Sequence, residues 1–224
     1  MAHVAAVDIV FPCLNEELAL PGVLARVPAD WRAIVVDNGS TDDSAAVAAA
    51  HGALVVTPPI RGFGSAAHTG LLAATAPIVA FCDADASMDP AELVRIVAPI
   101  LSGDARLVLG RRRPTKAGAW PLHARFANRA LAVLIRRATG IRLHDLGPMR
   151  AARREDLLAL DLQDRRSGYP LEMMLGAAAA GWKVLEVDTS YSPRVGKSKV
   201  TGTVRGTINA IRDMSRLLRI HRAS

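Results

Sequence analysis

The stretch PIVAFCDADASMDPAEL, residues 77–93, indicates how the chain folds and where its site lies. A short apolar run is followed by three carboxylates, Asp83, Asp85 and Asp89. Asp89 and Pro90 are typical of a helix N-cap and of the first helical position, so the stretch predicts a strand, a polar turn and a helix. Carboxylates this close repel one another and raise one another's pKa. The crowding therefore indicates a cation at the end of the strand.

The same alternation of strand and helix extends through the first half of the chain. We expect strands at residues 4–12, 31–38, 53–58, 77–84 and 105–112, and helices at 15–27, 40–52, 65–75 and 89–101. This order predicts an α/β fold, a Rossmann-like and mostly parallel sheet with helices on both faces. Four of these strands end in polar clusters, and open parallel sheets bind ligands beyond the carboxyl ends of their strands. The sequence thus predicts a site at that edge.

The second half of the chain is less regular. We expect helices at residues 125–140, 156–160 and 169–181, a strand at 182–192 and a closing helix at 204–222.

The composition limits the classes of protein and partner. Half of the 224 residues are hydrophobic, which allows a sizeable core, and the net charge of +7 indicates an anionic partner. Aromatic residues make up only 4% of the chain, so base stacking is disfavoured and we expect no nucleic acid partner. Cys13 and Cys82 lack metal-ligand spacing, which indicates reduced core thiols in a cytoplasmic protein. We expect neither a secretory signal nor a membrane span, because residues 62–82 are typical of a buried helix and strand.

Asp83 and Asp85 are the strongest candidates for a metal site. Side chains alternate along an extended segment, so both carboxylates point to one side. Two hard oxygen ligands suit Mg²⁺ or Mn²⁺, whose coordination is usually completed by water and substrate phosphates. We therefore expect a metal-bound diphosphate, whereas Asp89 is explained by capping alone. The alternative is that Asp83 and Asp85 are ordinary turn acids and that Asp89 only caps a helix.

Two further stretches suit a nucleotide. Asp37 follows a buried strand directly, where its carboxylate can accept hydrogen bonds from a base or a ribose. The next residues, 40–43, are suited to capping the following helix. RGFGSAAHTG, residues 61–70, places glycines including Gly64 at a helix start, where backbone N–H groups favour phosphate. It matches neither a dinucleotide fingerprint nor a phosphate-binding loop, so its signal alone is weak.

Eight segments in a fixed order resemble a known family. They are FPCLNEE, VVDNGSTDD, RGFGSAAHTGL, FCDADASMDPAEL, LVLGRRR, LHDLGPMRAARREDL, YPLEMMLGAAAAGWKVLEV and YSPRVGKSKVTGT. Together they resemble the family 2 glycosyltransferases, which have the GT-A fold. RVGKSK, residues 194–199, is most similar to the dolichyl- or polyprenyl-phosphate mannose or glucose synthase-like enzymes. The resemblance implies an inverting, metal-dependent hexosyltransferase that moves a sugar from a nucleotide diphosphate sugar, of GDP-mannose or UDP-glucose type, to a polyprenyl phosphate.

The resemblance also implies roles for residues of this chain. Those that match nucleotide- and diphosphate-binding positions are Pro12, Asn15, Glu16, Asp37, Asn38, Gly64 and Arg111 or Arg112. Asp83 and Asp85 match the metal-binding pair, and the candidate catalytic residues are Asp85, Arg194, Lys199, Asp145 and Glu172. Asp145 or Glu172 would serve as general base for an alcohol acceptor, with a structural ion pair to an arginine as the alternative for each. A phosphate acceptor needs no base, because its second pKa is about 6.

The expected organisation is one catalytic domain with a nucleotide-sugar half, residues 1–115, and an acceptor half, residues 116–224. The chain departs from the subgroup at Ser87, where Gln is common, and at GPMR, residues 147–150, where Gly-Phe-Arg is usual. A lipid-phosphate acceptor implies peripheral association with the inner face of the membrane. The segments 125–140 and 204–222 combine apolar stripes with arginines, as interfacial helices do, although core packing explains the same stripes.

Two other functions remain open on the sequence alone. One keeps the fold and transfers the sugar to a soluble acceptor hydroxyl. The other is a nucleotidyltransferase on a similar sheet, which is disfavoured because no glycine- and arginine-rich signature lies near residue 15.

Overall fold

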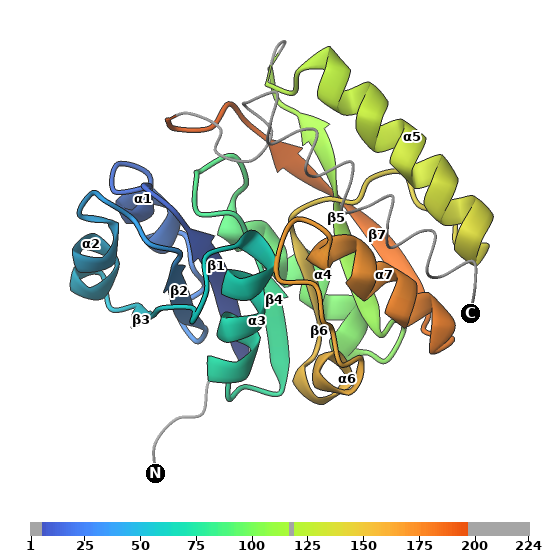
Figure 1. The fold of residues 1–224 in the computed structure, drawn as a ribbon, viewed down its shortest axis with the longest axis horizontal. Helices are drawn as coiled ribbons and strands as arrows, with labels where there is room; N and C mark the ends of the chain where they lie inside the picture. The colour runs from blue at the N-terminus through green and yellow to red at the C-terminus, as the bar shows by residue number, and fades with distance from the viewer. Residues whose placement is uncertain (1–5, 117–118, 197–224) are drawn as a thin grey trace.

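A computed structural model describes residues 6–116 and 119–196, which fold around one seven-stranded sheet (Figure 1). The strands are β1 (Val7–Cys13), β2 (Arg32–Asp37), β3 (Leu54–Val56), β4 (Ile78–Phe81), β5 (Leu107–Pro114), β6 (Arg150–Arg153) and β7 (Val184–Tyr191). They lie in the order β3-β2-β1-β4-β6-β5-β7. Neighbouring strands pair in parallel except β6, which is antiparallel to both β4 and β5. The predicted mostly parallel α/β sheet is confirmed.

Helices cover both faces of this sheet. They are α1 (Leu20–Leu24), α2 (Ser44–Ala50), α3 (Phe63–Ala73), the 3₁₀ helix η1 (Pro90–Glu92), α4 (Leu93–Leu101), α5 (Leu122–Thr139), α6 (Arg154–Ala159) and α7 (Tyr169–Ala179). Residues of α1, α2 and α4 join one apolar cluster, and residues of α3, α5, α6 and α7 join another. Parallel strands buried on both faces need such continuous apolar sequences, which is why β1 and β4 are apolar almost throughout.

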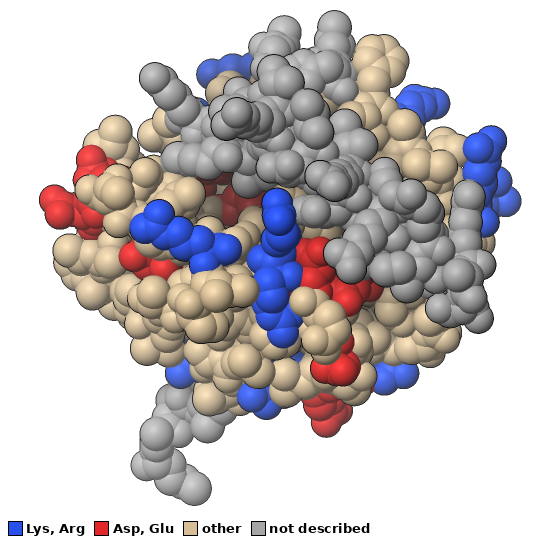
Figure 2. All heavy atoms as spheres, viewed as in Figure 1, with Lys and Arg blue, Asp and Glu red and all other residues tan. Residues whose placement is uncertain are grey.

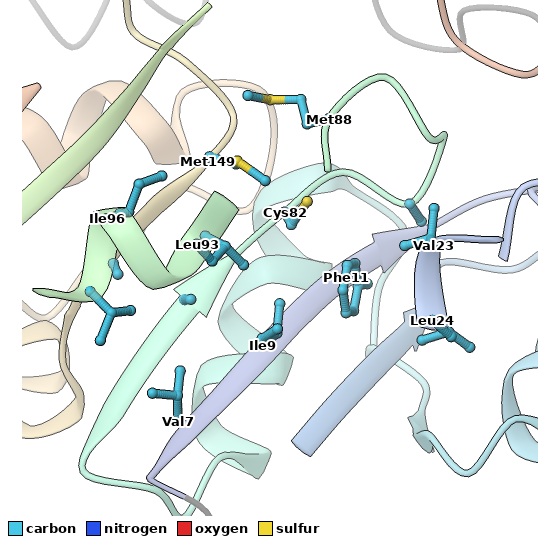
Figure 3. Packing of buried hydrophobic residues seen from close by; sticks show 14 of the residues in the cluster. Val7, Ile9, Phe11, Val23, Leu24, Cys82, Met88, Leu93, Ile96 and Met149 are labelled. Carbon is cyan, nitrogen blue, oxygen red and sulfur yellow. The ribbon is translucent and has the colours of Figure 1, made fainter. Parts of the chain in front are cut away.

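The first cluster packs directly below the predicted site. Ile9 and Phe11 of β1 lie against α1 on one side and against Leu93 of α4 on the other (Figure 3). Met88 and Cys82, from the segment that follows β4, belong to the same cluster. Both cysteines are free and buried, as expected. The acidic turn after β4 therefore packs against this buried apolar cluster.

Two helical predictions need correction. The helix expected at 15–27 is only α1, because the carbonyl oxygen of Glu16 accepts the N–H groups of Ala19 and Leu20 in turns that precede it. α2 begins at Ser44, and its N-cap Asp43 makes no side-chain capping bond, although Asp42 accepts the N–H of Ser44 at 3.1 Å. The residues before both helices instead form loops at the sheet edge.

The strand β6 was not anticipated. Its sequence RAAR has neither β-branched nor aromatic residues, so propensity gives no signal for it. It inserts between β4 and β5, which unites the two predicted halves of the chain in one sheet. Within the described ranges, no helix is long and apolar enough to cross a membrane. The closing helix expected at 204–222 lies outside them.

Candidate active site

The carboxyl ends of neighbouring strands bring predicted nucleotide residues to one edge of the sheet. Pro12 and Cys13 at the end of β1 pair with Val36 and Asp37 at the end of β2. On the other side of β1, β4 runs in the same direction and leads into Asp83. Because the strands are parallel, these residues share the edge at which such sheets bind ligands.

Asn15 and Glu16 fasten the loop after β1 to the loop after β2. Asn15 has a left-handed backbone with φ of 55°, which asparagine tolerates, and its N–H donates to Ser40 Oγ at 2.9 Å. Asn15 Oδ1 accepts from the N–H of Thr41 at 2.8 Å. The N–H of Glu16 donates to Ser44 Oγ at 2.8 Å. The two loops are therefore held as one surface.

Asn38 and Gly39 shape the turn after β2. Asn38 Oδ1 accepts from the N–H of Gly62 at 2.9 Å, which attaches the glycine-rich stretch to this turn. Gly39 has φ of +87°, and a Cβ built on it would lie 2.5 Å from Nε of Arg61. Arg61 thus lies over the turn next to Asp37. This arginine was not anticipated, because an arginine after the turn residues TPPI carries no signal by itself.

Gly64 has a packing role that the sequence did not suggest. Its N–H donates to the carbonyl oxygen of Arg166 at 2.9 Å, and the N–H of Ser65 donates to that of Arg165 at 2.9 Å. A Cβ on Gly64 would lie 2.7 Å from the carbonyl oxygen of Asp164. From the sequence we expected the N–H of Gly64 to favour phosphate. In the structure this N–H is instead hydrogen-bonded to the loop at Arg166.

Asp83 and Asp85 form an electrostatically strained pair at the end of β4. Burial, and then the charge of Asp85, raise the pKa of Asp83 to about 7. The side chain of Asp85 is buried, and its Oδ1 accepts from the N–H of Ser87 at 2.9 Å. Among the described residues, no group of three or more His, Cys, Asp or Glu side chains could hold a metal. Two hard carboxylates in a desolvated place nevertheless fit Mg²⁺ or Mn²⁺, with water and phosphate oxygens as further ligands.

The segment after β7 folds back onto this acidic turn. The N–H of Ser192 donates to the carbonyl oxygen of Ser87 at 2.8 Å, and the N–H of Val195 to that of Asp85 at 2.9 Å. Arg194 Nη1 lies 3.1 Å from Asp85 Oδ2. The structure therefore brings Arg194 to the acidic pair, whereas Lys199 lies outside the described residues.

Three arginines, Arg194, Arg112 and Arg150, act electrostatically on Asp83, and each favours its charged form. Arg150 is 4% exposed, and burial lowers its pKa to about 10. Its Nη2 donates to the carbonyl oxygen of Gly147 at 2.6 Å. In the sequence, Arg150 was notable only as part of GPMR, a departure from the subgroup's usual pattern. The missed signal was a charged residue at the start of a short apolar segment.

Asp145 holds Arg112 in a buried ion pair. Asp145 Oδ2 accepts from the N–H of Arg112 at 2.8 Å and from its Nε at 2.9 Å, while Oδ1 accepts from Nη2 at 2.7 Å. The guanidinium lies 4.0 Å from the ring centroid of Trp120 and 5.4 Å from that of Tyr191. Bidentate pairing and aromatic stacking together fix its orientation. This is the ion pair that the sequence analysis kept as the alternative to a base at Asp145.

The acceptor-side candidate Glu172 and the diphosphate-side candidate Arg111 also have structural partners. Glu172 accepts the N–H groups of Gln163 at 2.9 Å and of Asp164 at 2.7 Å, so it supports the loop that packs on α3. Arg111 pairs with Asp188 of β7, and its hydrogen bond lowers the pKa of that carboxyl to about 2. Of the two arginines named from the sequence, Arg112 is the one whose charge acts on Asp83.

A cleft of about 720 Å³ extends from Arg112 along α5. Its wall alternates basic and apolar side chains, with Arg125, Arg129, Arg136 and Arg142 beside Trp120, Phe126 and Val133. Among the described residues, these four arginines form no ion pair. On the face shown in Figure 2, several basic and acidic side chains lie close together. The cleft therefore offers unpaired positive charge next to apolar surface.

The site can be compared with known proteins. The model of the glycosyl transferase family 2 domain matches residues 8–160, more than half of the chain. The chain belongs to glycosyltransferase family 2. It is therefore a glycosyltransferase, and the alternative of a nucleotidyltransferase is set aside.

Relatives of this glycosyltransferase include enzymes with different acceptors. An uncharacterized glycosyltransferase of Mycobacterium tuberculosis is 56% identical over 95% of this chain and 98% of its own length. A dolichyl-phosphate hexose transferase of Haloferax volcanii is 31% identical over 86% of this chain and 85% of its own. The crystal structure of glucosyl-3-phosphoglycerate synthase from M. tuberculosis with Mn²⁺, UDP and phosphoglyceric acid has a TM-score of 0.75 at 26% identity. The structural match covers 96% of this chain and 78% of the synthase chain. The predicted GT-A fold is confirmed by this likeness.

Proposed function

We propose that this glycosyltransferase moves a hexose from a nucleoside diphosphate sugar to a polyprenyl phosphate. The bond between the anomeric carbon and the diphosphate oxygen breaks, and its electron pair leaves with the diphosphate. An oxygen of the acceptor phosphate forms the new bond from the opposite side, with inversion. Residues 1–115 would carry the donor and residues 116–224 the acceptor.

The observation that carries this proposal is the position of Arg112. The charge of Arg112 acts on Asp83 of the acidic pair, and its side chain also lines the arginine-lined cleft. An acceptor phosphate in the cleft would meet the donor at this point. A cation fixed in advance is the type of group that stabilises charge without reorganisation.

The carboxylates of the acceptor side point to the same acceptor chemistry. An alcohol must lose a proton, so it needs a base with a free lone pair within hydrogen-bond distance. Asp145 is engaged by Arg112, and Glu172 by two backbone N–H groups. A phosphate is already ionised near neutral pH and needs cations in place of a base.

Asp83 and Asp85 would hold Mg²⁺ or Mn²⁺ together with the donor diphosphate. A bound cation of this kind supplies Lewis acid stabilisation of the charge that builds on the leaving group. The solved structures of glucosyl-3-phosphoglycerate synthase include complexes with Mn²⁺ or Mg²⁺ and UDP, which supports the same cations here. Asn15, Asp37 and Asn38 would bind the nucleoside at the neighbouring strand ends.

A polyprenyl phosphate also requires contact with a membrane surface. α5 exposes Phe126, Val133 and Leu134 beside arginines such as Arg129 and Arg137. Apolar side chains flanked by arginines are typical of helices that lie in a bilayer interface. We expect the full chain to sediment with vesicles that contain phosphatidylglycerol, and less so as salt rises. Absence of binding at low salt would contradict this contact.

A soluble acceptor is the second candidate, because glucosyl-3-phosphoglycerate synthase has been solved with phosphoglyceric acid. The decisive experiment incubates the purified chain with labelled UDP-glucose or GDP-mannose, with Mn²⁺ or EDTA, and with either a polyprenyl phosphate or 3-phosphoglycerate. We expect label in the lipid fraction, only with the cation. Label in 3-phosphoglycerate alone would overturn the lipid acceptor.

A further inference from the structure

Glu186 of β7 is a carboxylate with no part in the proposed reaction, and its hydrogen-bond donors all come from His144 and Asp145. Its side chain is 11% exposed. The N–H of His144 lies 3.0 Å from both carboxylate oxygens, and the N–H of Asp145 donates to Oε1 at 2.9 Å. His144 Nδ1 lies 2.7 Å from Oε2. Glu186 therefore fixes the backbone at the two residues 144 and 145.

The backbone that Glu186 holds is the one that presents Asp145 to Arg112. Asp145 is 1% exposed, and its carboxylate accepts hydrogen bonds from the backbone N–H, Nε and Nη2 of Arg112. Arg112 has five side-chain N–H donors, and Asp145 accepts from Nε and Nη2. Among the described residues, no hydrogen bond engages Nη1. Arg112 is also one of the residues that line the cleft.

The loop is held from α5 as well. Asn128 Nδ2 donates to the carbonyl oxygen of His144 at 3.2 Å, and Asn128 Oδ1 accepts from the N–H of Leu146 at 3.2 Å. Next along the loop, a Cβ on Gly147 would lie 2.0 Å from the carbonyl oxygen of Gly110. The loop thus packs tightly on β5, but Glu186 supplies the only carboxylate that binds its backbone among the described residues. Loss of that charge would release the segment that carries Asp145.

We infer that Glu186 is a positioning residue that sets the Arg112 guanidinium for the acceptor phosphate, acting through the loop and Asp145. The role of Arg112 toward the acceptor phosphate rests on the proposed function. Its position against Asp145 does not depend on that function. Glutamine at residue 186 keeps the size of the side chain. It removes the charge, and it places an NH₂ group where one of the loop's N–H donors needs an acceptor.

The kinetic test is a double-mutant cycle with Glu186→Gln and Arg112→Gln. We expect Glu186→Gln to raise the KM for polyprenyl phosphate about 10-fold, by analogy with groups that orient metal ligands, and to leave the KM for the donor unchanged. In the Arg112→Gln background, Glu186→Gln should add little, since both changes act on the same guanidinium. Glu186→Asp, which keeps the charge, should recover part of the loss. Fully additive effects would overturn the inference.

Asp156→Asn is the matched control. It removes the carboxylate partner of Arg106, an exposed arginine outside the cleft, and should change neither KM. Equal thermal unfolding temperatures for Glu186→Gln and Asp156→Asn would separate positioning from a general loss of stability.

A second measurement needs no substrate. The Nε–H resonance of Arg112 should be slow to exchange in the wild-type chain, because Asp145 and Trp120 enclose it, and should broaden in Glu186→Gln. An unchanged resonance would overturn the inference. If it broadens but the wild-type chain transfers no sugar to any phosphate acceptor, the proposed function fails while Glu186 still positions Arg112.

Discussion

Arg194 Nη1 lies 3.1 Å from Asp85 Oδ2, so a guanidinium sits beside the carboxylate that is expected to bind a divalent cation. The backbone on either side of Arg194 is hydrogen-bonded to the same acidic turn. The charge of this arginine favours the ionised form of Asp83 in the crowded pair. We expect a bound cation to compete with that contact.

Arg194→Gln should therefore have opposite effects on binding and on turnover. Without the competing guanidinium, Mn²⁺ should bind more tightly in the absence of nucleotide, which electron paramagnetic resonance can measure. Turnover should fall about 100-fold, as when one pre-placed stabilising group is removed. Arg95→Gln, which alters an exposed arginine paired with Glu92, is the control. Weaker Mn²⁺ binding by Arg194→Gln would count against the competition.

Asp85→Asn should abolish cation-dependent turnover, with a loss of at least about 100-fold, and leave the fold intact. The measurement is the initial rate over a Mn²⁺ titration, with circular dichroism as a check on folding. Asp89→Asn is the matched control, because Asp89 accepts from the N–H of Ala91 at the start of η1 and pairs with Arg26. A fully active Asp85→Asn variant would place the metal site elsewhere.

Asp145→Asn should act on acceptor binding. Loss of a charged hydrogen bond of about 1.5–3 kcal/mol to Arg112 should raise the acceptor KM roughly 10- to 100-fold. If Asp145 were a general base, the substitution would instead lower kcat by about 100- to 10,000-fold and alter the pH profile. Steady-state kinetics across pH, with Glu172→Gln as the comparison, distinguish the two roles.

Gly70→Ala should destabilise the chain by about 1–3 kcal/mol through overpacking. A Cβ at this position would lie 2.2 Å from Val10 Cγ1, between α3 and β1. Val10→Ala in the same chain should recover part of the loss, because it removes the atoms that clash. Urea unfolding of the two single variants and the double variant gives the coupling energy. Simple additivity would show that the backbone, and not Val10, absorbs the change.

Asp8 should make stability depend on pH. Burial raises its pKa, but hydrogen bonds from Arg32 and from the N–H groups of Ala76 and Thr75 outweigh this and hold the pKa below its ordinary value. A carboxyl with a lowered folded-state pKa stabilises the fold above its unfolded pKa, and this contribution is lost as the pH falls through the folded value.

Asp8→Asn should therefore cost about 1.5–3 kcal/mol at neutral pH, because it removes charged hydrogen bonds from Arg32, whose side chain is partly exposed and remains solvated. The difference from the wild type should shrink below about pH 4, where the carboxyl is protonated in the unfolded chain. Thermal unfolding at several pH values measures it. Asp30→Asn, at an exposed position, is the control, and a gap that stays constant with pH would contradict the assignment.

Local sequence was sufficient to predict a strand, a helix start or a ligand-binding edge wherever the signal lies within a few residues. The apolar runs of β1, β2 and β4 predicted parallel strands, and the polar residues that follow each one predicted the ligand edge. Asp89 was correctly assigned to a helix start, because capping depends only on neighbouring residues. The hydrogen bond of the Gly64 N–H could not be predicted from local sequence, because the carbonyl oxygen that accepts it belongs to a residue about 100 positions away.

The sequence by itself determined the alternating α/β order, the paired carboxylates after β4 and the family, because each is written in short contiguous segments. Only the tertiary structure decided that β6 lies between β4 and β5 and that Asp145 holds Arg112. It also decided that Glu186 holds the loop that carries Asp145. The residues of these pairs lie 33 and 41 positions apart. Contacts at such separations depend on how the strands cross over and pack, which no local pattern of side chains encodes.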